Sequence, residues 1–172
     1  MSIATKVKKA ARKIEKAVTG EEPQVDILDT LKEEHEMVSA LLERLVNSGK
    51  PGERKSLVRQ IKAALMPHIK AEQKVLYNAL LAVRDKKAKQ DGAEGYIEHA
   101  LAERTLNDLG RLRSPLSPEL SATAKVLKEL IAHHVREEES DLWSDAREHF
   151  ESEERKAMNR LYLSEKKKVR IS

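Results

Sequence analysis

Histidines and glutamates recur at helical spacing along this chain, and their imidazole and carboxylate groups are common metal ligands. Two segments place a glutamate four residues after a histidine, and a third segment repeats that spacing. Side chains four residues apart lie on the same face of a helix, so each pair could bind one ion together. A fourth histidine, His35, lies in an earlier segment and has no glutamate four residues after it. The candidate metal ligands are His35, His68, Glu72, His99, Glu103, His134 and Glu138.

These candidates fall within apolar stripes, where charged groups are costly. Leu31, Val38 and Leu42 flank His35 at steps of three and four residues, and the other three histidines lie in similar stripes. One such histidine is usually a hydrogen-bonded core residue, but four histidines and three glutamates need a shared explanation. A bound cation supplies it, because it holds neutral imidazoles and ionised carboxylates in an apolar interior. Seven nitrogen and oxygen ligands are too many for one tetrahedral zinc and favour iron or manganese.

An internal repeat indicates two metal ions. The segment from His68 to Tyr77 aligns with that from His134 to Trp143, so that histidine, glutamate, leucine and aromatic positions coincide. The segments containing His35 and His99 align in the same way. Two helix pairs related in this manner present their ligands with approximate twofold symmetry, as in helical bundles with two carboxylate-bridged metals.

The repeat also selects between neighbouring residues. His133 and His134 cannot both face the core, and His134 fits both the apolar stripe and the repeat. The same argument prefers Glu138 to Glu137 and Glu139. His149 lies outside the motif and is expected to face solvent.

The elements that position these residues are predicted to be helices. Aromatic residues make up only 3% of the chain, whereas helix-favouring Ala, Leu, Glu, Lys and Arg are abundant. We predict an all-α fold: an up-down four-helix bundle with an N-terminal basic helix and a short C-terminal helix. The domains are a basic amphipathic extension (1–22), the bundle (26–150), and a C-terminal helix with a basic tail (151–172). The predicted bundle helices span 26–47, 53–87, 93–112 and 118–150, with Ser117 and Ser152 as N-caps of the fourth and last helices.

Composition excludes several other classes of protein. The absence of cysteine excludes disulfides, iron–sulfur clusters and cysteine-based zinc sites. No apolar run is long enough to span a membrane and the N-terminus lacks a secretory signal, so we expect a cytoplasmic protein without stable membrane insertion. The net charge of +4 is concentrated at the two ends of the chain. This distribution argues against nucleic acid as a partner.

The histidine and glutamate pattern resembles that of the hemerythrin family, also called the HHE cation-binding domain. His35, His68-x3-Glu72, His99 and His134-x3-Glu138 match its motifs in order and spacing over about residues 26–150. The resemblance implies two iron ions, bridged by an oxo or hydroxo group and by the carboxylates of Glu72 and Glu138. It also implies binding of dioxygen or a similar small diatomic or peroxide ligand.

The chain departs from the oxygen-carrying members at Glu103, where those members have a second histidine. A carboxylate ligand would favour ferric iron and redox chemistry over reversible oxygen carriage; alternatively, Glu103 does not bind and leaves a coordination position open. The expected function is to bind or react with dioxygen, peroxide or nitric oxide, in oxidative stress protection. The alternative is an iron- or oxygen-responsive regulator that acts through a partner protein.

Overall fold

The computed structural model describes residues 24–171, and this part of the chain is built from helices without a strand. The all-α prediction is therefore confirmed for these residues, whereas the predicted N-terminal basic helix (1–22) lies outside them. The elements, in chain order, are α2 (Ile27–Asn47), α3 (Pro51–Glu72), η1 (Gln73–Tyr77), α4 (Asn78–Ala82), α5 (Lys86–Arg111), α6 (Pro118–Glu137), η2 (Glu138–Leu142), α7 (Trp143–His149) and α8 (Ser152–Lys166).

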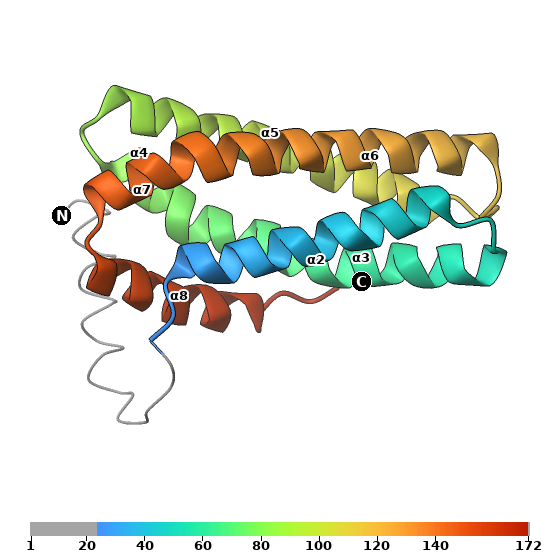
Figure 1. The fold of residues 1–172 in the computed structure, drawn as a ribbon, viewed down its shortest axis with the longest axis horizontal. Helices are drawn as coiled ribbons and strands as arrows, with labels where there is room; N and C mark the ends of the chain where they lie inside the picture. Colours follow the sequence, from blue (N-terminus) through green and yellow to red (C-terminus); the bar gives the residue numbers. More distant parts are fainter. Residues whose placement is uncertain (1–23, 172) are drawn as a thin grey trace.

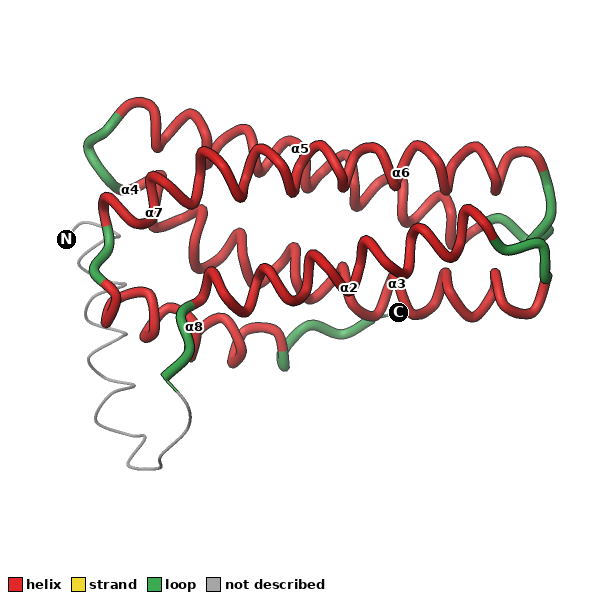
Figure 2. Tube along the Cα trace, viewed as in Figure 1, coloured by secondary structure: helices red, strands yellow, loops and turns green. Residues whose placement is uncertain are grey.

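Four long helices form the bundle. Helix α2 packs against α3 and α6, and α5 packs against the same two helices, so the four enclose a common interior. Figure 1 shows the loops between α2 and α3 and between α5 and α6 at one end of the molecule. The connections of α4 to α5 and of α7 to α8 lie at the opposite end, as the tube in Figure 2 also shows.

Polar side chains cap the beginnings of three of the four long helices. The side chain of Asp26 accepts a hydrogen bond from the backbone N–H of Leu28, and Ser117 accepts one from Leu120, as predicted for that cap. The third helix begins at Lys86 and not at residue 93. Its N-cap is Asp85, whose carboxylate accepts from the N–H of Ala88 at 2.9 Å.

The helices predicted at 53–87 and 118–150 are each interrupted by a π-helical turn. Helix α3 continues through Pro67 to Glu72, and the chain then forms η1 before α4. The second turn, η2, occupies the same place after α6. A π turn accommodates one extra residue, so the side chains that follow it are rotated relative to a continuous α-helix.

Two apolar clusters fill the interior, one on each side of the histidines. The cluster towards the loops at 48–50 and 112–117 includes Leu42, Leu65, Leu106 and Leu127. The cluster at the other end includes Leu31, Leu76, Trp143 and Tyr162. The polar residues therefore separate two apolar cores.

Helix α8 lies across α2 and α3 (Figure 1). It begins with a capping box in which Glu151 is the N-cap, so the predicted cap at Ser152 is wrong by one residue. Glu151 can take this position because the Glu154 carboxylate accepts from its backbone N–H. Arg155 forms an ion pair with Asp26 at 2.7 Å, which fixes α8 to the start of α2.

None of the helices between residues 24 and 171 combines the length and apolar character needed to cross a membrane.

Candidate metal centre

Four histidines, one from each long helix, meet in the interior of the bundle. His35 comes from α2, His68 from α3, His99 from α5 and His134 from α6, and each is at most 4% exposed. The Nε2 atoms of His99 and His134 lie only 3.1 Å apart. The ring centroids of His35 and His68 are 5.1 Å apart. Each side chain belongs to the inward face of its helix, which is how residues far apart in sequence converge.

Two buried carboxylates join these histidines in pairs. Oε2 of Glu72 lies 3.2 Å from Nε2 of His68 and 3.5 Å from Nε2 of His99. Oε2 of Glu138 lies 3.3 Å from Nε2 of His134 and 3.3 Å from Nε2 of His35. Each glutamate thus contacts the histidine four residues before it and one histidine from the other half of the sequence repeat. The approximate twofold relation seen in the sequence repeat is present in the side-chain arrangement.

Several buried nitrogen and oxygen atoms at this centre lack a hydrogen-bond partner. They are buried, so solvent cannot satisfy them, and leaving such groups unsatisfied costs free energy. The unpartnered atoms include Nε2 of His35 and Nδ1 of His99, together with both carboxylate oxygens of Glu72 and of Glu138. Atoms of this kind, aimed at one another in a closed interior, fit the ligands of a metal ion.

Glutamates on the outer side hold three of the imidazoles. Nδ1 of His35 lies 3.0 Å from Glu139, and Nδ1 of His134 lies 2.8 Å from Glu98. Nδ1 of His68 lies 3.1 Å from Glu34. An ionised carboxylate can only accept, so each Nδ1 carries the hydrogen and the inward Nε2 is the nitrogen available to a metal.

His99 has different surroundings. Its Nδ1 has no partner, and its Nε2 lies 3.3 Å from the phenol oxygen of Tyr77. Tyr77 is fully buried, and its ring stacks on His99 with centroids 5.0 Å apart. This placement depends on Gly95, because a Cβ there would lie 2.7 Å from Cζ of Tyr77. The fourth histidine is thus accompanied by a phenol instead of a carboxylate.

The buried charges shift the pKa values of the cluster. Burial alone would lower the pKa of His68, but the Glu72 and Glu34 carboxylates raise it to about 9. Burial is likewise outweighed at His134, where Glu138 and Glu98 raise the pKa to about 10. Burial and the charge of His134 hold the pKa of His99 well below its usual value. Without a metal, protons on His68 and His134 balance the buried carboxylates.

Glu103 does not join the cluster. Its carboxylate bonds Nζ of Lys70 at 2.5 Å, and its side chain is 28% exposed. The buried face of α5 steps from His99 to Ala102 and Leu106, which leaves Glu103 at its edge. In the sequence repeat Glu103 aligns with Ser39, which is exposed on α2. Because Ser39 faces solvent, the alignment indicates that the matching position on α5, Glu103, also lies outside the buried face.

The other histidines lie away from the centre. His133 is half exposed and contacts Glu98 at 3.2 Å, and His149 lies at the end of α7. The structure therefore brings together His35, His68, Glu72, His99, His134 and Glu138, and places Glu103, His133 and His149 elsewhere.

Sequence reasoning missed the residues that surround the candidate ligands. Two of them could have been found from the sequence, because the Glu-His pair at 34–35 recurs at 98–99. Each of these glutamates accepts a hydrogen bond from Nδ1 of the histidine on the next long helix, Glu34 from His68 and Glu98 from His134. Tyr162 had no such signal. Its hydroxyl lies 2.6 Å from Glu34 and 3.2 Å from Nδ1 of His68, through the packing of α8 alone.

The donor set fits transition metals. His35, His68, Glu72 and His134 each offer a ligand atom within 4.8 Å of the others. His99 and Glu138 lie within 3.5 Å of members of this group. Mixed imidazole and carboxylate ligands suit iron, manganese or zinc better than calcium or magnesium.

Comparisons with known proteins agree with this geometry. A DNA nickase from Nostoc sp. (strain PCC 7120 / SAG 25.82 / UTEX 2576) is 29% identical over 145 residues, which cover 84% of this chain and 40% of that protein. The chain thus spans about two-fifths of the length of this relative. No solved structure matches the chain. The family described as Hemerythrin HHE cation binding domain matches residues 26–146, across all four bundle helices. This chain therefore belongs to the hemerythrin HHE cation-binding domain family.

Proposed function

We propose that the protein holds two iron ions between its four long helices and binds or reacts with dioxygen, peroxide or nitric oxide. The observation that best supports this proposal is the set of buried imidazole and carboxylate atoms without hydrogen-bond partners. These atoms form two groups, one around Glu72 and one around Glu138. The ligands would be His35, His68, Glu72, His99, His134 and Glu138. The proposal includes the up-down order of the bundle, in which α2–α3 and α5–α6 form two hairpins.

The surrounding residues prepare the ligands for this role. The carboxylates of Glu34, Glu98 and Glu139 keep the inward nitrogens of three imidazoles directed at the centre. The apolar clusters border the centre on two sides and, within residues 24–171, leave no polar neighbour there except the candidate ligands and the groups that hold them. Bound there, iron would supply reversible ligand binding or electron transfer to an oxygen species.

Tyr77 lies beside His99, the imidazole whose Nδ1 has no partner. Burial and the Glu138 and Glu72 carboxylates raise the pKa of this phenol, so it stays protonated and can donate a hydrogen bond next to His99. We include Tyr77 in the proposal as the group that stabilises an anionic small ligand on that side. Tyr77→Phe should keep the iron content and shorten the lifetime of the oxygen or nitric oxide adduct. An unchanged lifetime would remove Tyr77 from the proposal.

The test is metal analysis and optical spectroscopy on protein purified without chelator. We expect about two irons per chain, absorption in the near ultraviolet from the ferric pair, and a spectral change when the anaerobically reduced protein meets oxygen. His35→Ala should lose iron, whereas the matched His133→Ala should keep it. A colourless preparation that takes up no added iron would contradict the proposal.

A hydrolytic role in DNA cleavage, suggested by the name of the Nostoc relative, is a second candidate. Metal pairs can cleave phosphodiesters, but the pocket beside His134 is lined by carboxylates that would repel a phosphate backbone. The part of that relative outside the match could also carry its activity. A supercoiled-plasmid nicking assay with the iron-loaded protein separates the two candidates, and nicking that is lost in His35→Ala would favour hydrolysis.

A further inference from the structure

A pocket of about 40 Å³ leads from the surface between α5, α6 and η2 to the candidate metal centre. One water-sized ligand needs roughly 10–15 Å³, so the pocket can hold more than one. His134, Glu138 and Tyr77 line its inner part. It is therefore a physical connection between solvent and the buried ligands.

Carboxylates line this pocket along its whole depth. Those of Asp91, Glu94, Glu98, Glu137, Glu138 and Asp141 belong to its ten lining residues, which include no lysine or arginine. Two exposed cations pair with these carboxylates: Lys87 lies 2.7 Å from Asp91, and Arg136 lies 3.8 Å from Glu137. The negative charge of the six carboxylates is thus only partly neutralised.

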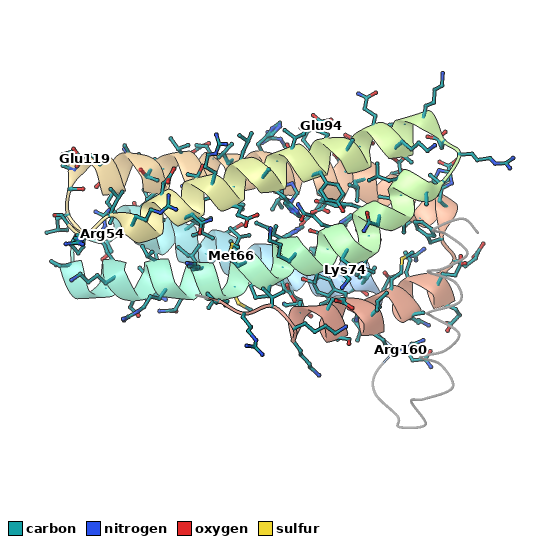
Figure 3. The ribbon with its side chains drawn as sticks, turned by 180° about the vertical axis from the view of Figure 1, so that it is seen from behind. Arg54, Met66, Lys74, Glu94, Glu119 and Arg160 are labelled. Carbon is teal, nitrogen blue, oxygen red and sulfur yellow. The ribbon has the colours of Figure 1, made fainter. Side chains whose placement is uncertain are left out.

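The carboxylates form a graded series from solvent to interior. Side-chain exposure falls from 56% at Asp141 to 16% at Glu98 and 2% at Glu138. Figure 3 shows Glu94 on the outer side of α5, where it faces solvent. Glu98 spans the middle, since its Oε1 contacts the half-exposed His133 and its Oε2 contacts Nδ1 of the buried His134.

The innermost carboxylate of the series is that of Glu138, one of the candidate metal ligands. Both carboxylate oxygens of Glu138 lack a hydrogen bond, although the residue is buried and lines the pocket. This buried carboxylate has only the inward nitrogens of His35 and His134 close to it, at 3.3 Å each, and it is suited to bind a cation. Dioxygen is neutral and gains nothing from such charges.

We propose that this acidic pocket is the route by which divalent iron reaches the centre. The inference rests on the proposed iron site and adds to it how the ion is loaded. Exposed Glu94 and Asp141 attract the hydrated ion, Glu98 replaces part of its water shell, and Glu138 receives it. Clefts lined by one sign of charge raise the rate at which an opposite charge arrives, and added salt weakens the effect.

The experiment measures the rate of iron binding, not its extent. The chain has a single tryptophan, and Trp143 stacks on His35 with ring centroids 5.9 Å apart, so its fluorescence should report iron at the centre. Metal-free protein is mixed with Fe²⁺ under anaerobic conditions in a stopped-flow instrument, at low and high salt. The test variant is E94Q/D141N, and E94K/D141K extends the charge series.

The matched control is E33Q/E36Q, which removes the same charge from the exposed face of α2. We expect E94Q/D141N to slow Fe²⁺ binding about three- to tenfold at low salt, with a larger effect in E94K/D141K. The difference should narrow as salt is added, and the final iron content should equal that of wild type. The control should bind at the wild-type rate.

Two outcomes would overturn the route while leaving the iron site intact. One is wild-type rates in both pocket variants; the other is equal slowing in the pocket variant and the control. If wild type itself binds no iron, the proposed function fails and the route fails with it. Circular dichroism of each variant establishes that a slower rate does not arise from lost helix.

Discussion

At the level of single residues, the four imidazoles differ in what holds their outer nitrogen. Three of them donate to a glutamate, whereas Nδ1 of His99 has no partner and its neighbour is the phenol of Tyr77. In the sequence repeat, the residue that corresponds to Glu139 is Gln73, which carries no charge. The two halves of the centre are therefore alike in their ligands and unlike in the groups around them.

Glu98 should matter more for metal affinity than Glu103, which lies five residues further along α5. Glu98→Gln removes the charge that holds Nδ1 of His134, and such a loss lowers metal affinity about 10- to 100-fold. Glu103→Gln serves as the matched control, since that carboxylate bonds Lys70 and should leave iron affinity unchanged. Competition with a chelator measures both affinities. Lower affinity in Glu103→Gln would return Glu103 to the set of ligands.

The raised pKa values predict how the metal-free protein responds to pH. His68 and His134 have ordinary pKa values of 6.5 in the unfolded chain and about 9 and about 10 when folded. Their protonated forms therefore stabilise the folded state below pH 6.5, and this stabilisation is lost as pH rises through 9 to 10. The urea midpoint of the metal-free protein should fall over that range. A midpoint that rises between pH 7 and 10 would contradict the assignment.

At the level of elements, two features place the residues around the centre. The π turns η1 and η2 follow Glu72 and Glu138 directly, and they end at or next to the aromatic residues Tyr77 and Trp143. Helix α8 adds a third aromatic residue from outside the four-helix bundle. Its Tyr162 and Lys166 both bond Glu34, which in turn holds His68.

Helix α8 is therefore expected to influence the metal centre. Tyr162→Phe removes a hydrogen bond to the partly buried carboxylate of Glu34 and should lower stability by about 1–3 kcal/mol, with weaker iron binding. Tyr96→Phe is the control, since its hydroxyl bonds Gln73 O and Asn78 and touches no candidate ligand. Urea unfolding and iron titration of both variants provide the measurements. Equal iron affinity in wild type and Tyr162→Phe would confine α8 to a packing role.

At the level of the whole molecule, the layer of ionisable groups divides the apolar core in two. A metal that binds only the folded state stabilises it by mass action, by about 4 kcal/mol when free metal exceeds Kd a thousandfold. The melting temperature should therefore fall clearly when iron is removed. Mg²⁺, which prefers oxygen ligands, should not restore it. Equal melting temperatures with and without iron would exclude a stabilising role for the centre.

The helical periodicity of apolar residues was sufficient to predict a bundle of helices and to predict that six candidate ligands face its interior. Histidine and glutamate within an apolar stripe leave few alternatives, because burial forces them towards one another. Spacing alone did not separate Glu103 from Glu72 and Glu138, since all three follow a histidine by four residues, whereas the buried face of α5 steps by three residues after His99 and leaves Glu103 outside the cluster. The π turns and Tyr162 could not be predicted, since they depend on how separate helices pack and not on local propensity.

The matching π turns also bear on how such a chain could have arisen. Each represents one residue more than a regular helix needs, and each lies at the buried glutamate of its half, Glu72 or Glu138. Two unrelated insertions at the same place would be a coincidence, whereas one hairpin that already carried the extra residue would supply both halves when duplicated and fused. On that history the ancestral hairpin paired with a second copy of itself around the cluster of histidines and glutamates. The difference between Gln73 and Glu139, which occupy the same place in the two halves, then arose after fusion allowed the halves to diverge.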